Sequence, residues 1–410
     1  MIERVREACN RLGCTRYKIL IHTVTNTNFI FNNTDEITQK SFINEITLYI
    51  EYNNKLGVVK NEFNCNFDVD WLVSKAIYDS CINDINYIDF DFKSVNYIDK
   101  CFSPESDIKI LKLIQDKKNL VESHKNYQID YINYSYKLTN TVVYFDDNNT
   151  YCDSNYINMI NIYGSNLKLK TPINIRQFNI SDNLDLLNLI QKYNDAYTIK
   201  PNTLYPLKGM IRFSYNVMAK MISLISNIFN ARNILSDRVF ITKYDINKYI
   251  FCNEIDIIDD PLCKSSNMYL CDHEGVKCSK KYLIKHGILQ DVLNNEKTKL
   301  LLQGTTSGNC FFDYANNDLA IQPTNLILNI NKTYEYEYDI YISDININES
   351  IFDFQSGHFT LKLIGKYKNS KKFKYFSFDY NIKKFINNIN PASSGKWINN
   401  IYVPEVYLKV

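Results

Sequence analysis

Strand-like runs recur along most of this chain, and only a few segments have the periodicity of an amphipathic helix. Near the N-terminus, YKILIHTVTNTNFIF reads as a strand, and SFINEITLYIEYNNKLGVVKNEF reads as two strands joined by a turn at Asn53-Asn54. This mixture predicts the α+β class. We expect N-terminal α+β units followed by a mostly antiparallel β C-terminal domain with one prominent helix.

The length of 410 residues is too great for one ordinary domain. We predict an N-terminal α+β unit over residues 1–100, a middle α+β unit over residues 101–205 and a β-rich C-terminal domain over residues 206–410. The segment IKPNTLYPLKG, with two prolines and a glycine, reads as the connector that leads into the last of these.

Helix signals occur in each predicted unit. Asp68 can cap a helix whose buried stripe is Leu72, Val73, Ala76 and Ile77. In the middle unit, Ser103 followed by Pro104 predicts one helix start, and Ser181 or Asp182 another. The C-terminal domain begins with a helix from about Ser214 to Asn233.

Charge and cysteine usage exclude several classes of function. The net charge of +2 favours neither nucleic acid nor an anionic membrane as a partner. The first residues, MIERVREACNRLG, predict an amphipathic helix with Ile2, Val5, Cys9 and Leu12 on one face, not a secretion signal. Scattered cysteines, 11 in number, indicate free thiols in a reducing cytoplasm. The most apolar stretch, VMAKMISLISNIF, is too short and too polar to span a membrane.

The stretch DDPLCKSSNMYLCDHEGVKC, from Asp259 to Cys278, concentrates three cysteines, one histidine and four carboxylates. Its possible zinc ligands are Cys263, Cys271, His273 and Cys278. Their spacing matches no paired Cys-x-x-Cys or zinc-finger pattern, although zinc tolerates irregular spacings. A metallopeptidase helix needs two histidines about one turn apart with a glutamate beside the first. The His273-Glu274 pair is followed by Lys277 and Cys278 where the second histidine would stand.

Other catalytic and binding motifs are missing. The sequence has no Gly-x-Ser-x-Gly nucleophile elbow. The segment GTTSGN, residues 304–309, lacks the lysine of a phosphate-binding loop and reads as an ordinary loop. KYKNSKKFKYF, residues 366–376, mixes lysines with aromatics, and the simpler interpretation is a hairpin with a solvated face.

The order of short motifs after about residue 206 resembles the TldD/TldE (PmbA) family of peptide-processing metallopeptidases. The first set matches the family's Asp-Asp-Pro, Asp-x-Glu-Gly-Val, basic segment and Gly-x-Leu motifs: Asp259-Asp260-Pro261, Asp272-His273-Glu274-Gly275-Val276, Cys278-Ser279-Lys280-Lys281 and Gly287-Ile288-Leu289. The second set matches its Gly-Asn turn, Pro-x-Asn-Leu strand start and Thr-Gly-Asp-Phe-Ser segment: Ser307-Gly308-Asn309-Cys310, Pro323-Thr324-Asn325-Leu326 and Ser356-Gly357-His358-Phe359-Thr360.

The resemblance implies a role for some of these residues in peptide binding or in the structure. They are Asp259, Asp260, Pro261, Asp272, Glu274, Gly275, Ser307, Gly308, Asn309 and Gly357. In the same alignment Cys271, His273 and Cys278 stand where the family has other residues that are not metal ligands. The family's glycine-rich spacer after Asp-Asp-Pro is replaced here by LCKSSNMYL.

TldD-type members of the family carry His-Glu-x-x-x-His on the helix before Asp-Asp-Pro, and a distant cysteine completes their zinc site. Here that helix reads NVMAKMISLISNIFN, and Ser394 in SSGKW stands in place of the cysteine. A serine hydroxyl does not replace a thiolate as a zinc ligand. The chain therefore resembles the TldE type, for which no catalytic or metal-binding residue is expected.

The implied function is a non-catalytic subunit without activity of its own. A TldD-type partner in a heterodimer would supply the zinc, and the substrates would be small or unfolded peptides, including the leader segments of modified peptides. Neither nucleic acid nor a membrane is an expected partner. Two alternatives remain open from the sequence: a stand-alone peptide-binding or scaffold protein, and a peptidase with a metal site rebuilt from the cysteines and histidine of residues 259–278.

Overall fold

The structure is a computed structural model in which the chain divides into two compact units. The first unit comprises Met1–Tyr193 together with His273–Val276, and the second comprises Asn194–Asp272 and Lys277–Val410. The residues that the structure describes are 1–32, 36–63, 67–82, 127–145, 150–166, 171–178, 204–263, 269, 271–274, 276–302, 305–306, 308–313, 318–331, 336–370 and 373–410.

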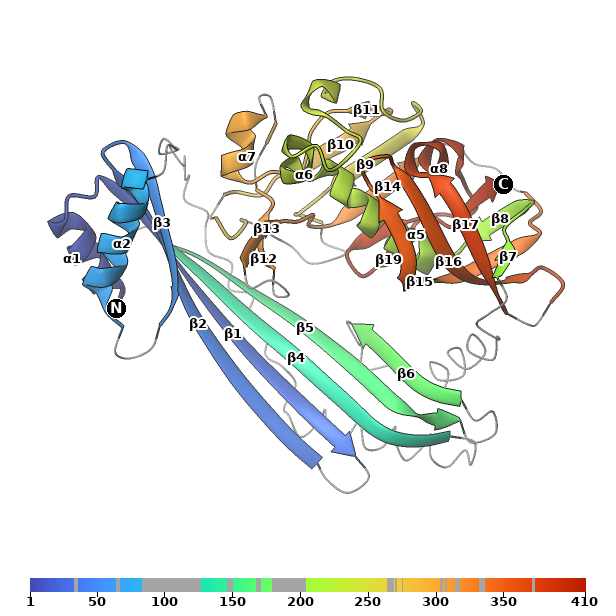
Figure 1. The fold of residues 1–410 in the computed structure, drawn as a ribbon, viewed down its shortest axis with the longest axis horizontal. Helices are drawn as coiled ribbons and strands as arrows, with labels where there is room; N and C mark the ends of the chain where they lie inside the picture. The colour runs from blue at the N-terminus through green and yellow to red at the C-terminus, as the bar shows by residue number, and fades with distance from the viewer. Residues whose placement is uncertain are drawn as a thin grey trace. The chain divides into compact units, whose positions relative to one another are not determined.

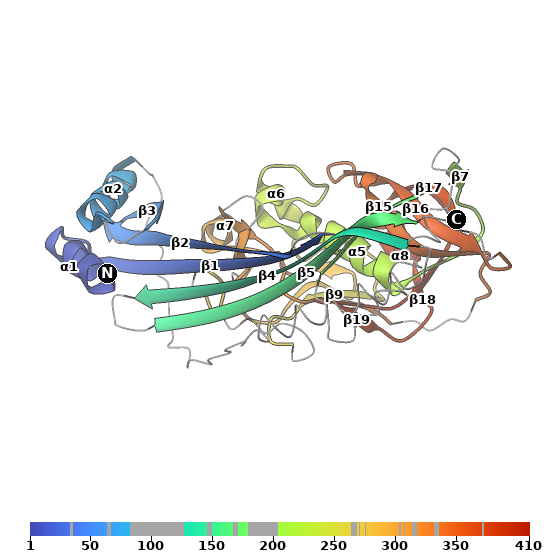
Figure 2. The ribbon, with the colours of Figure 1, turned by 90° about the horizontal axis from the view of Figure 1, so that it is seen from below.

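The first unit is built on a six-stranded antiparallel sheet in the order β3-β2-β1-β4-β5-β6. Its central strands run side by side as long ribbons (Figures 1 and 2). β2 turns into β3 through Asn53 and Asn54, which have positive φ angles of 53° and 60°, so the predicted turn is confirmed. The strands are β1 (Arg16–Asn32), β2 (Glu36–Tyr52), β3 (Lys55–Glu62), β4 (Tyr127–Phe145), β5 (Thr150–Asn166) and β6 (Thr171–Phe178).

The pairing of β1 with β4 joins regions that the sequence suggested were separate. β1 pairs with β2 on one side and with β4 on the other. Strands of the predicted units 1–100 and 101–205 therefore share one sheet and one compact unit. Side-chain alternation along a strand indicates which face of the sheet each residue occupies. It does not indicate which distant strand will pair with the free N–H and C=O groups along the strand's edge.

Two helices, α1 (Ile2–Arg11) and α2 (Val69–Ile82), pack at the end of this sheet where β3 lies (Figure 1). Asp68 caps α2 as predicted, because its Oδ1 accepts a hydrogen bond of 3.0 Å from the backbone N–H of Trp71. A Cβ at Gly57 in β3 would lie 2.0 Å from the carbonyl oxygen of Ala76, so glycine permits the close approach of α2. The shared core contains Val5, Ala8, Cys9, Ile19, Ile46, Leu48, Leu72, Val73 and Ala76.

The second unit contains two larger sheets and a small hairpin, and its core is built around the helix α5 (Tyr215–Ile225). The first sheet has the order β11-β10-β9-β14-β20-β19. Its strands are β9 (Ile255–Asp259), β10 (Lys281–Lys285), β11 (Ile288–Leu289), β14 (Leu326–Ile330), β19 (Lys396–Ile398) and β20 (Ile401–Val403). The hairpin pairs β12 (Cys310–Asp313) with β13 (Asp318–Ile321).

The second sheet has the order β18-β21-β8-β15-β16-β17-β7. Its strands are β7 (Leu204–Pro206), β8 (Met210–Phe213), β15 (Ile340–Asp353), β16 (His358–Tyr367), β17 (Lys374–Asn381), β18 (Asn390–Pro391) and β21 (Val406–Lys409). β16 and β17 form the antiparallel hairpin predicted around residues 366–376. Most pairings in the unit are antiparallel, and α5 contacts strands of both sheets, so the predicted α+β class and β-rich C-terminal region are confirmed.

The helix predicted from about Ser214 to Asn233 begins as expected but does not continue as one helix. Ser214 caps α5 by accepting a hydrogen bond from the N–H of Val217 at 3.3 Å. A 3-10 turn follows, η1 (Ser226–Phe229), and Asn230 then caps α6 (Ala231–Leu235). The Ser226 hydroxyl donates to the carbonyl of Ser223 at 2.6 Å, and such side-chain bonds compete with the regular helical pattern.

Among the described residues, the other short helices are η2 (Lys243–Asp245), α7 (Glu296–Leu301) and α8 (Ile382–Asn388). The helices predicted at Ser103 and at Ser181 or Asp182 lie outside the described residues. Within the described part of the chain, no helix combines the length and apolar character that crossing a membrane requires.

Candidate functional site

Several of the motif residues meet at the end of β9, where Asp259 is the last residue of the strand and is 1% exposed. Its Oδ1 accepts hydrogen bonds from both the backbone N–H and the hydroxyl of Thr324, each at 2.7 Å. Its Oδ2 accepts a third, also at 2.7 Å, from the side-chain amide of Asn309. One buried carboxylate thus connects β9 to the loops before β12 and β14.

Lys281 supplies the positive charge of this network. It lies opposite Asp259 in the pairing of β9 with β10, and its Nζ donates to Oδ1 of Asn309 at 2.6 Å. Burial raises the pKa of the Asp259 carboxyl, while the hydrogen bonds from Thr324 and Asn309 and the charge of Lys281 act in the opposite direction. The bonds and the lysine charge offset part of the cost of burying the carboxylate, and burial remains the larger effect.

Asp260 and Asn325 tie the next residue of the Asp-Asp-Pro motif to the start of β14. The backbone N–H of Asp260 donates to the carbonyl of Asn325, and the side-chain amide of Asn325 donates back to the carbonyl of Asp260, both at 2.9 Å. The Asp260 carboxylate accepts a hydrogen bond from the backbone N–H of Leu262 at 3.2 Å and lies 3.5 Å from the Lys280 ammonium. The carbonyl of Pro261 accepts from the N–H of Tyr269 at 2.8 Å. These bonds fix the chain as it leaves β9.

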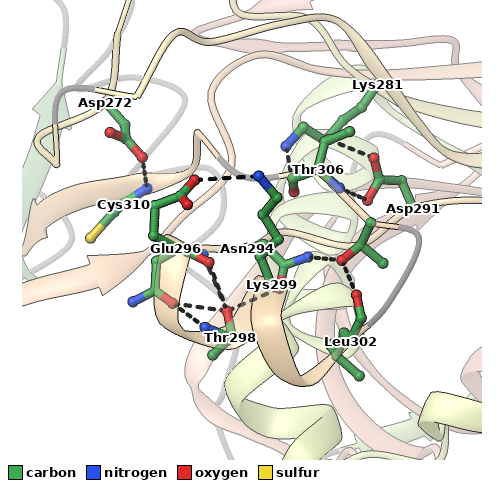
Figure 3. Close-up of polar contacts among 12 residues, drawn as sticks. Asp272, Lys281, Asp291, Asn294, Glu296, Thr298, Lys299, Leu302, Thr306 and Cys310 are labelled. Atoms are coloured by element: carbon green, nitrogen blue, oxygen red, sulfur yellow. Dashed lines mark hydrogen bonds and ion pairs between the residues drawn. The ribbon is translucent and has the colours of Figure 1, made fainter. Parts of the chain in front are cut away.

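The acidic motif and the Gly-Asn turn are linked in the same way. Asp272 is fully buried, and its Oδ2 accepts a hydrogen bond of 3.0 Å from the backbone N–H of Cys310 (Figure 3). The Cys278 thiol donates to the carbonyl of Gly308 at 3.2 Å. Gly308 has a φ of +100°, and a Cβ there would lie 3.2 Å from the carbonyl oxygen of Lys277. Burial, followed by the nearby Asp272 carboxylate, raises the pKa of the Cys278 thiol well above its usual range.

A second set of polar contacts supports this loop from Asp291 and Asn294, in the segment before α7. Lys281 and Asp291 both reach Thr306: the Lys281 Nζ donates to its carbonyl at 3.4 Å, and its hydroxyl donates to the Asp291 carboxylate at 2.6 Å (Figure 3). The Asn294 side chain donates to the Thr305 hydroxyl at 2.8 Å, and the Asn294 carbonyl accepts from the N–H of Asn309 at 3.0 Å. The buried groups at the end of β9, Asp259, Asn309 and Thr324, have hydrogen-bond partners inside the protein, so this part of the network holds loops in place.

Other predicted residues lie elsewhere. Glu274 belongs to the first unit, where its carbonyl accepts a hydrogen bond from the Lys18 ammonium. Gly357, with a φ of +72°, forms the turn from β15 to β16 beside Phe240 and Asn381, in the other sheet of the second unit. Gly275 and Ser307 lie outside the described residues.

The four possible zinc ligands of residues 259–278 are not gathered into one group. His273 lies in the first unit, where its ring centroid is 5.6 Å from that of His22. Burial, followed by the proximity of His22, lowers the pKa of His273 to about 3. Cys271 forms a backbone bridge with Lys277, and Cys278 is the hydrogen-bond donor described above. Among the residues that the structure describes, no three His, Cys, Asp or Glu side chains form a group able to hold a metal ion.

A different polar surface lies where α5 meets the segment before β19. The Tyr215 hydroxyl, at the start of α5, donates to the carbonyl of Ser394 at 3.3 Å, and the Lys396 ammonium lies 6.0 Å from the Tyr215 ring centroid. Asn216 and Ser223 are exposed on the outer side of α5, and Lys220 lies half-buried between them in an ion pair of 2.5 Å with Asp344. We use the name α5 face for the surface formed by Tyr215, Asn216, Lys220, Ser223, Asp344, Ser394 and Lys396.

The α5 face was not identified from the sequence as a site, although Lys220 gave a signal as a lone charge within an apolar helix. The structure brings together the two segments that, by the family resemblance, correspond to the zinc ligands of a TldD-type chain. Here they offer amide, hydroxyl and ammonium groups. Zinc in proteins is held by thiolate, imidazole and carboxylate groups, so the side chains of α5 and Ser394 do not fit a zinc ion.

Comparison with known proteins gives a consistent result. Residues 208–410, close to half of the chain, match the family model described as the PmbA/TldA metallopeptidase C-terminal domain. A solved structure from Thermotoga maritima, described as a proposed modulator of a DNA gyrase, superposes with a TM-score of 0.78 at 13% identity and covers 100% of this chain and 98% of its own. No curated protein sequence matches the chain.

Two further solved structures share the fold. TldE from Thermococcus kodakarensis has a TM-score of 0.72 at 13% identity and covers 100% of this chain and 98% of its own. A protein from Bacteroides thetaiotaomicron, also described as a proposed modulator of DNA gyrase, has a TM-score of 0.73 at 12% identity and covers 99% of this chain and 96% of its own. At these identities the likeness concerns the fold, which extends over both units.

Proposed function

Because this chain belongs to the TldD/TldE (PmbA) family, we propose that it is a non-catalytic, TldE-like subunit of a zinc metallopeptidase complex. The α5 face carries the proposal: the helix that bears the metal ligands in TldD-type chains has here the sequence YNVMAKMISLI, without His, Glu, Asp or Cys. Ser394 beside it is no substitute for a thiolate. The zinc and the glutamate base would therefore come from a TldD-type partner, and the two chains would form a heterodimer.

The subunit would contribute one wall of a peptide-binding cavity. β19 is the last strand in the order of its sheet, and among the described residues no strand pairs with its outer edge. An extended peptide could add there through backbone hydrogen bonds, as edge strands commonly allow. The α5 face lies beside β19, since the Tyr215 hydroxyl donates to the Ser394 carbonyl and the Lys396 ammonium, on β19, lies 6.0 Å from the Tyr215 ring centroid. Lys220, Ser223 and Asn216 would then contact the peptide backbone or its carboxylate.

The network around Asp259 would have a supporting role in this function. It fixes the end of β9, and β9 pairs with β14, which in turn pairs with β20 next to β19. The buried motif residues would thus maintain the sheet on which the peptide lies and would make no contact with the peptide. The substrates would be small or unfolded peptides, including leader segments, and the complex would act in the cytoplasm without nucleic acid or membrane partners.

Zinc content and peptidase activity of the purified chain test the first part of the proposal. We expect far less than one zinc per chain and no cleavage of an unstructured peptide. When the chain is coexpressed with a TldD-type subunit, we expect one stable complex on a sizing column, with zinc and peptidase activity. Stoichiometric zinc together with peptide cleavage by the isolated chain would overturn the assignment.

The same samples distinguish the two alternatives. If the chain binds peptide but never copurifies with a TldD-type subunit, it acts as a stand-alone peptide-binding or scaffold protein. If the isolated chain binds zinc, a double variant, Cys271→Ser with His273→Gln, shows whether residues 259–278 hold it. Loss of the metal in that variant, with unchanged metal in a Cys252→Ser control, would support the rebuilt site.

A further inference from the structure

The C-terminal end of α1 is closed by a Schellman motif. Gly13 has a left-handed φ of +79° and donates its N–H to the carbonyl of Asn10 at 3.3 Å. The N–H of Cys14 donates to the carbonyl of Cys9 at 3.0 Å. This is the 6→1 and 5→2 pair of hydrogen bonds by which a glycine ends a helix.

The two residues joined by the longer of these bonds are both cysteines. A Schellman motif usually includes an apolar contact between the side chains at these two positions. Here Cys9 and Cys14 are both free thiols that are 0% and 7% exposed and belong to the same core cluster. Their side chains share a hydrogen bond, which raises the pKa of Cys9, with burial acting in the same direction. The same bond lowers the pKa of Cys14, against the effect of burial.

The backbone geometry suits a covalent bond between the two sulfurs. The 3.0 Å hydrogen bond joins the backbone nitrogen of Cys14 to the carbonyl oxygen of Cys9. The nitrogen is bonded directly to the Cα of Cys14, and the oxygen is two covalent bonds from the Cα of Cys9. The Cα atoms can therefore be no more than about 7 Å apart. Disulfides span Cα separations of roughly 4.4–6.8 Å, so little or no backbone movement is required.

We propose that Cys9 and Cys14 are a redox pair that closes reversibly into a disulfide at the end of α1. The oxidant is a small-molecule disulfide such as glutathione disulfide. The Cys14 thiolate attacks one sulfur of the oxidant, forms a mixed disulfide and releases one glutathione thiol. The Cys9 thiolate then attacks the Cys14 sulfur and releases the second. Two protein thiols are oxidised to one disulfide, and one glutathione disulfide is reduced to two thiols.

Cys14 is the attacking residue because it is the more exposed of the two. The disulfide would fix the turn that leads from α1 into β1, and α1 packs on α2 in the same core. Oxidation would therefore reduce fraying of α1, and reduction would restore it. The effect would be confined to the end of the first unit that carries both helices.

The sequence allows a direct assay on the full chain. Trypsin cuts after Arg6, Arg11 and Arg16, so Cys9 and Cys14 fall on separate peptides, residues 7–11 and 12–16. After incubation in glutathione buffers of increasing oxidation, free thiols are alkylated and the unreduced digest is analysed by mass spectrometry. We expect a joined 7–11/12–16 peptide that appears as the buffer becomes oxidising and is lost after reduction.

Cys271 and Cys278 provide a matched internal control. They are also buried and also fall on separate tryptic peptides, residues 265–277 and 278–280. The Cys278 thiol is already a donor to the Gly308 carbonyl. We expect the 7–11/12–16 product to exceed the 265–277/278–280 product at least about tenfold, because thiol access and geometry decide exchange rates.

Single variants test the order of the steps. In Cys9→Ser the mixed disulfide cannot be resolved, so a glutathione adduct on Cys14 should accumulate; in Cys14→Ser, Cys9 should remain a free thiol. The proposal is wrong if the wild-type digest never contains the joined peptide, or contains no more of it than of the control product. Since that measurement uses the wild-type chain, it holds even if a variant folds poorly.

Discussion

The end of β9 and the α5 face carry the same kinds of polar groups, yet these groups differ in what they contact. At the end of β9, Asp259 is 1% exposed and accepts three hydrogen bonds from the protein. On the α5 face, Lys220 has one ion pair with Asp344, and both side chains are more than a third exposed. A buried polar group with internal partners specifies the structure, whereas a half-exposed one is available to a ligand. In this molecule Asp259 and its partners are bonded within the protein, and Lys220 is accessible.

The largest effect should come from Asp259→Ala. The substitution leaves the donors of Thr324 and Asn309 without their acceptor and Lys281 without its compensating charge, a change that costs about 3–5 kcal/mol. The chain has two tryptophans, Trp71 in the first unit and Trp397 in the second. In a Trp71→Phe background, urea unfolding followed by Trp397 fluorescence should show this loss.

Asp344→Ala is the matched control for that measurement, because it removes a carboxylate from the α5 face. Its effect should stay below about 1 kcal/mol. If Asp259→Ala and Asp344→Ala lower the free energy of unfolding equally, the end of β9 and the α5 face do not differ in their contribution to stability.

The second effect concerns the buried histidine of the first unit. The pKa of His273 is lowered to about 3 in the folded chain from an ordinary value of 6.5, first by burial and then by His22. The Lys18 ammonium donates to the backbone carbonyl of the next residue, Glu274. The unfolded chain therefore binds more protons between these values, so stability is present above pH 6.5 and is lost as the pH falls towards 3. The free energy of unfolding of the first unit should decrease by about 2 kcal/mol between pH 7 and pH 5.

Trp71 fluorescence in a Trp397→Phe background follows this unit. In His273→Gln the decrease between pH 7 and pH 5 should disappear, while in His358→Gln, which removes an exposed histidine, it should persist. If the free energy of unfolding decreases by the same amount between pH 7 and pH 5 in His273→Gln, a group other than His273 is responsible for the pH dependence.

Thr324→Val should have a smaller effect. It preserves the shape of the side chain and the backbone N–H bond to Asp259, and it removes only the hydroxyl donor at 2.7 Å. A hydrogen bond to a charged group contributes about 1.5–3 kcal/mol, so we expect a loss near the lower end of that range. If urea unfolding shows no decrease in the free energy of unfolding, the Thr324 hydroxyl is not needed to stabilise the buried Asp259 carboxylate.

The smallest effect on stability should come from Lys220→Met, below about 0.5 kcal/mol, because the ion pair is partly exposed. Binding of a fluorescein-labelled unstructured peptide, measured by anisotropy, should nevertheless weaken about fivefold, which corresponds to about 1 kcal/mol. Thr324→Val should leave that affinity within about twofold of wild type if its fold is intact. The reverse pattern would place the peptide at the β9 network.

Much of the local structure could be read from residue patterns. The Asn53-Asn54 turn, the Asp68 cap, the Ser214 cap and the β16–β17 hairpin depend on interactions within a few residues. The division into three units did not anticipate that β1 pairs with β4, since that pairing joins backbone edges far apart in the chain. The single helix predicted to reach Asn233 ends at Ile225, because serine and asparagine side chains compete for its carbonyls.

The motifs of residues 259–278 also show what the sequence could and could not predict about the candidate site. Sequence order was enough to indicate the family resemblance. The residues of α5 were enough to show that this helix offers no thiolate, imidazole or carboxylate, because donor atoms are a property of the residues themselves. Only the tertiary structure decided that Asp259, Asn309 and Thr324 meet in a buried network, that His273 lies beside His22, and that Ser394 lies against α5. These outcomes depend on burial and on contacts between distant segments, which arise when the sheets assemble and are not encoded in any short stretch of residues.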